Sequence, residues 1–310
     1  MRVLFWGTPE FAVPSLRALL GAGHEVVGVV TQPDRQAGRG RKLKASAVKE
    51  VAVAEGLPIL VPDRPRGQAF VEEARALRPE LSVVAAYGHI LPLEVLEVPE
   101  QGSLNLHASL LPELRGAAPV NWALIRGLDQ TGVTIMRMTE GMDEGPILLQ
   151  RELPISANDT ASGVLVRLAE LGAEALAGAL ALLEAGTIEA RPQDHGQATY
   201  APKISRETAR IDWSRSAVEV GNHMRGMDAV PGAWTTLDGE SIKLFRPVVL
   251  KEDAGAAPGS VLQADPDQGL VVATGRGRLR LDEVQPAGKR RMGAAAWLRG
   301  RGPLDGARFS

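Results

Sequence analysis

The feature that most constrains the fold is an alternation of short β-branched runs with helical patterns over the first half of the chain. The runs predicted to be strands are Val3–Trp6, Glu25–Val30, Leu81–Ala85, Ser103–His107 and Val133–Met138. The segments predicted to be helices are 11–20, 46–55, 68–77, 119–127 and 160–184. Strands that alternate with helices favour an α/β fold with a mostly parallel, doubly wound sheet.

The periodic pattern breaks after residue 189, where a polar stretch bounded by prolines shows no regular spacing of apolar residues. We interpret this stretch as an interdomain linker. Beyond it, a short helical pattern is followed by strand-like pieces that Gly, Asp and Pro separate, which favours a small β-barrel, with an oligonucleotide-binding (OB-like) type as one option. The strand-like pieces are Ala233–Leu237, Ser241–Pro247, Gly259–Ala264, Gly269–Ala273 and Arg278–Val284. The predicted division is 1–189 for the first domain, 190–205 for the linker and 206–310 for the barrel domain.

Composition excludes several classes of chemistry. The chain has no cysteine, which rules out disulfides, thiolate metal sites and a cysteine nucleophile. No apolar run approaches the ~20 residues of a membrane helix, so no membrane association is expected. The first nine residues have the pattern of a strand and a turn rather than a signal peptide, and we expect a cytoplasmic protein.

The first turn lacks the glycines of a dinucleotide-binding fold. Only Gly7 stands where G-x-G-x-x-G would be expected, and Gly21 and Gly23 are better explained as a helix C-cap. Walker-type phosphate loops and H-E-x-x-H are also absent from the sequence. We therefore expect neither a nucleotide cofactor nor a metal.

Asn105 and His107 form the strongest candidate site. They are two residues apart at the end of a predicted strand, so their side chains should point to the same face of the sheet. An amide and an imidazole together suit the stabilisation of a carbonyl oxygen as it becomes an oxyanion. Asp143, in a Gly- and Pro-containing turn, is a candidate third partner for the imidazole. The alternatives are a structural histidine and an ordinary turn aspartate.

A basic segment follows the second predicted strand. Between Asp34 and Lys44 the sequence has five cationic residues and two glycines, which makes a helix or a strand unfavourable there. A basic loop near the predicted site suits the phosphates of a nucleic acid, although a solvated surface loop is nearly as good an explanation. Residues 203–310 carry 17 Lys and Arg against 13 Asp and Glu, so a polyanionic partner is also compatible with the second half.

Several motifs resemble one known family. The run Asn105-Leu-His-Ala-Ser-Leu-Leu-Pro112, the following Arg115-Gly-Ala-Ala-Pro119 and the later Met142-Asp-Glu-Gly-Pro-Ile-Leu148 look like those of the folate-dependent formyltransferases. The opening Trp6-Gly-Thr-Pro resembles that of the branch that acts on initiator tRNA, and Gln32-Pro-Asp-Arg35 through Gly38-Arg-Gly40 resembles the inserted tRNA-contacting loop of that branch. Leu114 departs from the family, because an aromatic residue is common at that position, and the turn 228–234 departs from the family's more proline- and tryptophan-rich pattern.

The resemblance implies a Rossmann-like first domain, an OB-like second domain that binds tRNA, and a set of site residues. The residues implied to be catalytic are Asn105, His107 and Asp143, with the first two stabilising the oxyanion and the third assisting. The residues implied to contact folate are Ser109, Leu110, Leu111 and Pro112. The residues implied to contact tRNA are Arg35, Arg39, Arg41, Lys42 and Lys44.

The implied reaction moves a formyl group from the co-substrate 10-formyltetrahydrofolate to the α-amine of methionyl initiator tRNA, in support of translation initiation. We expect a monomer. Four alternatives stay open at this point: a formyltransferase for glycinamide ribonucleotide, one for a sugar nucleotide, a hydrolase of formyl-folate, and a non-catalytic RNA-binding protein. The acceptor that receives the formyl group separates them.

Overall fold

The chain divides into two compact units. The computed structural model describes residues 1–37, 42–250, 255–302, 304 and 306–310. The first unit comprises Met1–Gly116, Thr131–Pro154 and Leu165–Tyr200. The second unit comprises Ala117–Gln130, Ile155–Val164 and Ala201–Ser310.

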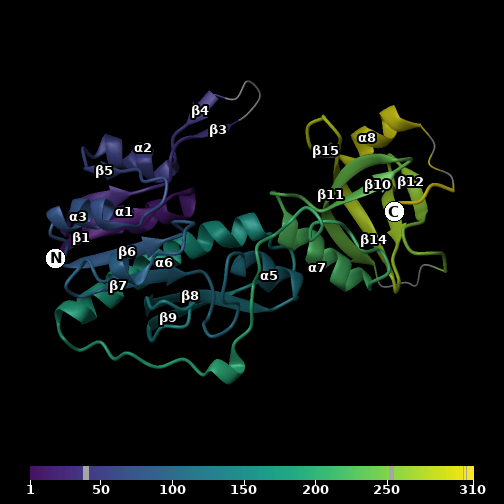
Figure 1. Cartoon of the computed structure of the whole chain (residues 1–310). Coiled ribbons are helices and arrows are strands. Elements are labelled where there is room, and N and C mark those ends of the chain that lie inside the picture. Colours follow the sequence, from purple (N-terminus) through teal and green to yellow (C-terminus); the bar gives the residue numbers. More distant parts are fainter. Residues whose placement is uncertain (38–41, 251–254, 303, 305) are drawn as a thin grey trace. The chain divides into compact units, whose positions relative to one another are not determined.

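Within the described residues, the first unit is built on a seven-stranded sheet in the order β5-β2-β1-β6-β7-β8-β9 (Figure 1). Its strands are β1 (Arg2–Gly7), β2 (Glu25–Val30), β5 (Ile59–Leu60), β6 (Leu81–Ala85), β7 (Ser103–His107), β8 (Gln130–Arg137) and β9 (Ile147–Pro154). The pairs from β5 through β7 are parallel, whereas β7 and β8 are antiparallel. The prediction of a mostly parallel α/β sheet is therefore confirmed.

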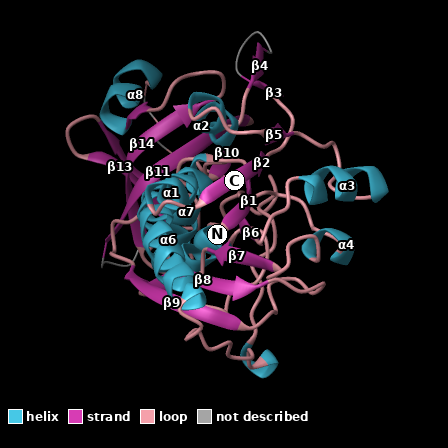
Figure 2. Ribbon diagram, turned by 90° about the vertical axis from the view of Figure 1, so that its left-hand side faces the viewer, coloured by secondary structure: helices cyan, strands magenta, loops and turns pink. Residues whose placement is uncertain are grey.

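Helices cover both faces of this sheet. They are α1 (Val13–Gly21), α2 (Ala47–Ala54), α3 (Gln68–Ala76), α4 (Leu93–Leu96) and α6 (Ala161–Glu184), with 3-10 turns at Glu10–Ala12 and His195–Gln197. Figure 2 shows α1 and α6 on one face, and α3 and α4 on the other. Leu4 and Trp6 of β1 face the second pair of helices, where they pack with Phe70 of α3 and Leu96 of α4. Alternate residues of each strand thus bury apolar side chains on opposite faces.

The carboxyl ends of four strands meet at one edge of the sheet. Trp6 of β1 pairs with Val30 of β2 and with Val84 of β6, and Val84 pairs with Asn105 of β7. Because these strands are parallel and in register, the loops that follow them emerge together. Ligand sites of open α/β sheets lie at this kind of edge.

The second unit is an antiparallel sheet with helices packed against it. Its elements are α5 (Pro119–Ile125), α7 (Ala217–Met227), β10 (Trp234–Leu237), β11 (Glu240–Leu250), β12 (Val261–Asp265), β13 (Gly269–Ala273), β14 (Arg278–Pro286), β15 (Met292–Gly293) and α8 (Ala294–Arg301). The strand order is β10-β11-β14-β13-β12, with β15 beside β14. One core joins side chains of α7 and α8 to those of the strands, among them Met224, Leu244 and Trp297. This arrangement is compatible with an OB-like barrel, although its two edge strands do not pair with each other in the described residues.

The last residues of the chain join the two edges of this sheet. The Phe309 amide donates to the Gly259 carbonyl (2.9 Å) beside β12, and the Ser310 amide donates to the Thr236 carbonyl (3.0 Å) in β10. Phe309 is buried and stacks on Trp213 with ring centroids 5.7 Å apart. The tail, residues 306–310, therefore supplies hydrogen bonds that β10 and β12 do not make to one another.

No helix in the described part of the chain combines the length and the apolar character that crossing a membrane requires.

Candidate active site

Asn105 and His107 lie on the same face of β7. Between them, Leu106 points the other way, toward α6, where a Cβ at Gly172 would be 2.8 Å from its side chain. The strand therefore buries its apolar residues against the helix and presents the amide and the imidazole on its other face. Asn105 is partly buried and His107 is buried, at the edge where the parallel strands end.

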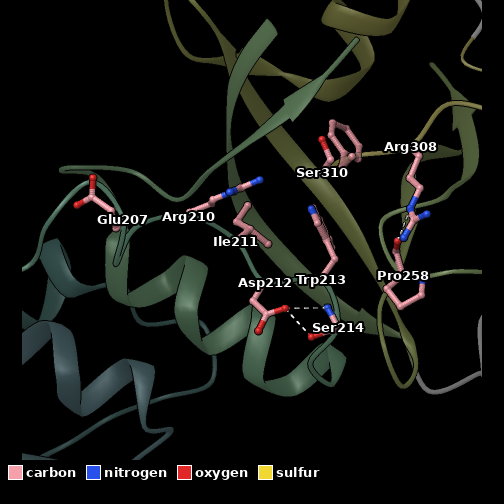
Figure 3. Close-up of a pocket in the computed structure, with 10 residues that line it drawn as sticks. Glu207, Arg210, Ile211, Asp212, Trp213, Ser214, Pro258, Arg308 and Ser310 are labelled. Atoms are coloured by element: carbon pink, nitrogen blue, oxygen red, sulfur yellow. Dashed lines mark hydrogen bonds between the residues drawn. The ribbon is translucent and has the colours of Figure 1, made fainter. Parts of the chain in front are cut away.

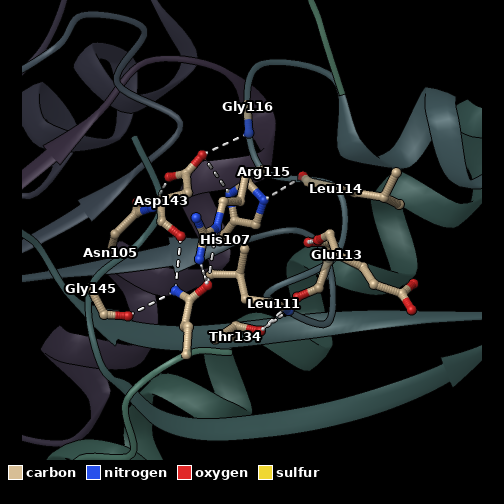
Figure 4. Close-up of polar contacts among 12 residues, drawn as sticks. Asn105, His107, Leu111, Glu113, Leu114, Arg115, Gly116, Thr134, Asp143 and Gly145 are labelled. Atoms are coloured by element: carbon tan, nitrogen blue, oxygen red, sulfur yellow. Dashed lines mark hydrogen bonds and ion pairs between the residues drawn. The ribbon is translucent and has the colours of Figure 1, made fainter. Parts of the chain in front are cut away.

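Asp143 comes back to this pair from the turn between β8 and β9, which we call the Asp143 turn (residues 141–145). Its Oδ1 accepts a long hydrogen bond from Asn105 Nδ2 (3.4 Å), and its Oδ2 lies 3.7 Å from His107 Nδ1. Oδ2 also accepts a hydrogen bond of 2.8 Å from the Gly116 amide. Figure 4 shows the three side chains converging with the loop that follows β7. The structure thus brings together all three residues predicted to be catalytic.

The orientation of the imidazole follows from its second nitrogen. His107 Nε2 lies 3.0 Å from the Leu114 carbonyl, which can only accept, so Nε2 carries a proton and donates. Nδ1 is then the nitrogen that faces Asp143. When Nδ1 is also protonated, the ring is an imidazolium cation paired with a carboxylate, the form that best stabilises negative charge nearby.

The Ser109–Pro112 loop is tied to β8 and β9. The Ser109 hydroxyl donates to the Glu113 carbonyl (2.6 Å), and the Thr134 hydroxyl donates to the Ser109 carbonyl (2.7 Å). The Leu111 amide donates to Thr134 Oγ1 (3.1 Å), and Gln150 Nε2 donates to the Leu111 carbonyl (2.9 Å). Ser109 and Leu111 are buried, whereas Leu110 and Pro112 are partly exposed. These hydrogen bonds hold in place the loop that comes directly after Asn105 and His107 in the chain.

The basic segment forms two short strands, β3 (Arg35–Ala37) and β4 (Lys42–Lys44), which we call the basic hairpin. They pair antiparallel, with Arg35 opposite Lys44. The expectation that this segment forms neither helix nor strand was wrong, because three alternating residues on each side suffice for a short ladder despite their charges. Arg35 and Lys44 are exposed. Arg39 and Arg41 lie outside the described residues.

Two buried polar residues of the site were not predicted from the sequence. Arg115 stands out there only as part of a motif, and Gln193 lies in the stretch that was interpreted as a linker. Gln193 donates a hydrogen bond to the Asp143 turn, and Arg115 donates to Gln193. The signals for them are weak, because a polar residue in a non-periodic segment is exposed in most proteins.

At the same edge of the sheet, burial changes the pKa of the Tyr87 side chain. Burial raises the pKa of Tyr87, which follows β6, to about 12. Its ring packs edge-on against Trp6 with centroids 5.3 Å apart. Among the described residues, no cluster of three or more His, Cys, Asp or Glu side chains could hold a metal ion.

Two cavities are formed wholly by the second unit. One, of about 780 Å³, is lined by Arg210, Asp212 and the tail (Figure 3). The Ser214 hydroxyl donates to Asp212 there (2.6 Å), and this hydrogen bond lowers the pKa of the carboxyl. The other, of about 1040 Å³, contains Arg291 with both its terminal nitrogens on Asp228 (2.6 and 3.1 Å). The charges in the second cavity are thus largely paired within the protein.

Comparisons with known proteins agree over the whole chain. The family model described as formyl transferase matches residues 1–180, and the model for the formyl transferase C-terminal domain matches residues 203–302. A protein of Desulfotalea psychrophila named methionyl-tRNA formyltransferase is 48% identical over 300 residues, which cover 97% of this chain and 93% of that protein. A protein of the same name from Thiobacillus denitrificans is 48% identical over 313 residues, covering 100% of this chain and 99% of that protein.

Solved structures share the fold. HypX from Aquifex aeolicus, in complex with tetrahydrofolic acid, superposes with a TM-score of 0.64 at 21% sequence identity. The match covers 96% of this chain and 47% of HypX. At this level of identity the likeness concerns the backbone arrangement of the chain.

Proposed function

The chain belongs to the formyl transferase family, and from that membership we propose that it transfers the formyl group of 10-formyltetrahydrofolate to the α-amino group of methionyl initiator tRNA. The observation that carries the proposal is the end-to-end likeness to proteins named methionyl-tRNA formyltransferase, which reaches 100% of this chain and 99% of the relative's length. The likeness includes both units. The protein is accordingly an enzyme, a one-carbon acyl transferase that supports translation initiation.

The formyl donor is a folate. A structural neighbour binds tetrahydrofolic acid, and the family model is that of a formyl transferase. Folate acts here as a co-substrate, and the reaction as proposed needs neither a metal nor a nucleotide cofactor. The donors at the sheet edge suit a formyl oxygen, since Asn105 and His107 both present N–H groups there.

In the proposed mechanism, Asn105 and His107 stabilise the oxyanion. The neutral methionyl amine attacks the formyl carbon, and the carbonyl electron pair moves onto its oxygen. Asn105 Nδ2 and His107 Nδ1 donate hydrogen bonds to that oxygen, because Nε2 is already bonded to the Leu114 carbonyl. The oxyanion then collapses, the bond to the folate nitrogen breaks, and the formyl group remains on the amine.

Asp143 has two tasks in this scheme. Its carboxylate places a negative charge beside the imidazole, with Oδ2 3.7 Å from Nδ1, which is too far for a hydrogen bond and leaves an Nδ1 proton available for the oxyanion. It also accepts the proton that the amine sheds, directly or through water, and that proton passes on to the departing folate nitrogen. The Gly116 amide, 2.8 Å from Oδ2, holds the carboxylate in place while this happens.

Two further groups of residues bind the substrates in this proposal. The Ser109–Pro112 loop contacts the folate beside the catalytic residues, through Ser109, Leu110, Leu111 and Pro112. The basic segment between Asp34 and Lys44 contacts tRNA phosphates through Arg35, Arg39, Arg41, Lys42 and Lys44, and the exposure of Arg35 and Lys44 supports this.

We propose residues 1–189 as a catalytic domain, 190–205 as a linker and 206–310 as a tRNA-binding domain, with the linker packed as part of the first unit as far as Tyr200. The two family matches, which end at 180 and begin at 203, support this division. We further propose that the protein works in the cytoplasm and that it is a monomer. Sedimentation of the purified chain tests whether it is a monomer.

The experiment is to incubate the enzyme with formyl-labelled 10-formyltetrahydrofolate and each acceptor in turn. Label on the methionyl amine of charged initiator tRNA is the expected result. Label on glycinamide ribonucleotide or on an amino-sugar nucleotide would assign the chain to another formyltransferase. Formate alone would indicate hydrolysis, and unchanged folate would contradict any catalytic function.

A further inference from the structure

Asp143 occupies a backbone conformation that is uncommon for residues other than glycine, although aspartate adopts it more often than most. Its φ is +54°, in the left-handed region that non-glycine residues rarely adopt. Such a conformation persists only where the surroundings fix it. The position of the catalytic carboxylate therefore depends on contacts to the main chain of the Asp143 turn.

Gln193 makes those contacts. Its Nε2 donates to the Asp143 carbonyl (2.9 Å) and to the Gly145 carbonyl (2.8 Å). Both protons of the amide group are thus used on the Asp143 turn, one before and one after Glu144. Gln193 is only 6% exposed, so water offers little competition for these bonds.

Arg115 fixes which way the Gln193 carboxamide faces. Gln193 Oε1 accepts two hydrogen bonds from this guanidinium, one from Nε (3.1 Å) and one from Nη2 (2.7 Å). A guanidinium only donates and a backbone carbonyl only accepts, so the reverse orientation of the amide would leave every one of these contacts repulsive. Arg115 is itself 2% exposed.

The same short run of chain controls the other side of the site. Within residues 114–116, the Leu114 carbonyl accepts from His107, Arg115 orients Gln193, and the Gly116 amide donates to the Asp143 carboxylate. The Arg191 amide and carbonyl, two residues before Gln193, both bond to Ile147 at 2.8 Å. The backbone two residues before Gln193 is therefore fixed, in addition to the Gln193 side chain.

We propose that Gln193, oriented by Arg115, is a positioning residue that holds the Asp143 turn in the conformation that directs the carboxylate at His107. This inference rests on the proposed formyl transfer. It assigns to the segment after α6 a role in the chemistry of the first unit, through a hydrogen-bonded clamp formed by Arg115, Gln193 and the two turn carbonyls.

The informative variant is Gln193→Glu. The carboxylate keeps the shape of the side chain and pairs with Arg115, but it replaces the two donors to the turn with an acceptor that repels both carbonyls. We expect kcat for methionyl-tRNA formylation to fall by roughly 10²-fold, since a displacement of about 1 Å of a catalytic group has this effect. The KM values for the folate and for the tRNA should change less than threefold, because substrate contacts are intact.

Gln193→Met is the second variant and Gln197→Ala is the control. Met has a similar volume and keeps the fold while removing both the donors and the acceptor, so kcat should again fall with little change in KM. Gln197 lies four residues further along the same segment, is exposed and bonds to Asp194 (2.9 Å), so its variant should match the wild type.

Each outcome is decisive. Wild-type kcat in both Gln193 variants, or a rise in KM at constant kcat, would overturn the positioning role while leaving the proposed function intact. Failure of both variants to fold, seen as loss of the thermal transition, would show the clamp to be purely structural and would also overturn it. A wild-type enzyme that formylates no methionyl-tRNA would contradict the proposed function itself.

Discussion

At the scale of single residues, the site depends on polar groups whose partners are fixed on one side and open on the other. His107 has Nε2 committed to the Leu114 carbonyl, whereas Nδ1 lies 3.7 Å from Asp143 Oδ2, too far for a hydrogen bond. Among the described residues, the Asn105 amide donates one long hydrogen bond, to Asp143, which leaves its second proton for another acceptor. Such asymmetry keeps donors available for a charge that develops during the reaction.

Asn105→Ala tests this most cleanly, because Asn105 makes few structural contacts. We expect turnover at saturating folate and tRNA to fall by roughly 10²–10³, the usual effect of removing one oxyanion donor. The thermal transition should be unchanged within a few degrees. Asn158→Ala, at an exposed asparagine, is the control. Turnover within a factor of three of the wild type would remove Asn105 from the chemistry.

Tyr87 offers a stability test at the same scale. Among the described residues, no group lies within hydrogen-bonding distance of its buried hydroxyl. Tyr87→Phe removes an unsatisfied polar group, so the free energy of unfolding should rise by about 1 kcal/mol at neutral pH.

The pH dependence of that variant follows from the pKa of Tyr87, which burial raises from 10.0 to about 12. Between these values the unfolded state loses the phenol proton and the folded state keeps it. The wild-type free energy of unfolding should therefore fall, relative to Tyr87→Phe, by up to about 1.4 kcal/mol per pH unit. Denaturant titrations at pH 8 and pH 11 measure the difference, and an equal gap at both would contradict the assignment.

At the scale of elements, sequence periodicity predicted those strands and helices whose apolar residues recur at a regular local spacing. Glu25–Val30, Leu81–Ala85 and Ser103–His107 are strands with the predicted bounds. The first two are mostly apolar runs, as buried parallel strands are, and the third alternates polar and apolar residues. β9 was missed, since this edge strand is half exposed and carries Arg151 and Glu152 within it. α8 was missed because only a few of its residues, such as Trp297, face the core.

The candidate site, like the elements, could be predicted from the sequence only where a local pattern determines it. Asn105 and His107 are two positions apart on one strand, so their convergence follows from strand geometry. Asp143 could be proposed from the sequence only beside the alternative of an ordinary turn aspartate, because its approach to His107 depends on how the fold returns a separate turn to β7. Gln193 and Arg115 meet across 78 residues of sequence. A hydrogen bond between distant segments leaves no periodic trace in either of them.

The basic hairpin carries a prediction about salt. Lys42→Ala combined with Lys44→Ala should weaken tRNA binding, and it should flatten the slope of log K against log salt by about 1 for each phosphate that the variant no longer neutralises. Arg75→Ala is the matched control, since this exposed residue lies in the last turn of α3, before the opposite end of β6. An unchanged slope in the double variant, measured by filter binding, would make the hairpin an ordinary surface feature.

At the scale of the whole molecule, the two units differ in what stabilises their sheets. The first unit has a continuous sheet with helices on both faces. The second unit depends on the tail, because residues 309 and 310 make the hydrogen bonds that join its edges. The stability of the second unit should therefore respond to changes near residue 309 as strongly as to changes in its core.

Phe309→Ala tests this dependence. Phe309 is 1% exposed and stacks on Trp213, so truncation should lower the free energy of unfolding by about 3–5 kcal/mol. Val230→Ala, at a side chain that is 83% exposed, should change it by less than about 0.5 kcal/mol. Tryptophan fluorescence during denaturant unfolding measures both. Equal stabilities would show that the tail is dispensable.

The clamp formed by Gln193 also bears on how the enzyme is divided for experiments. A fragment that stops at residue 180, where the first family match ends, retains Asn105, His107 and Asp143 but loses Gln193. The same is true of a fragment that stops at residue 189. Because the first unit continues to Tyr200, an excised catalytic piece must extend that far before its inactivity can be attributed to the missing tRNA-binding half.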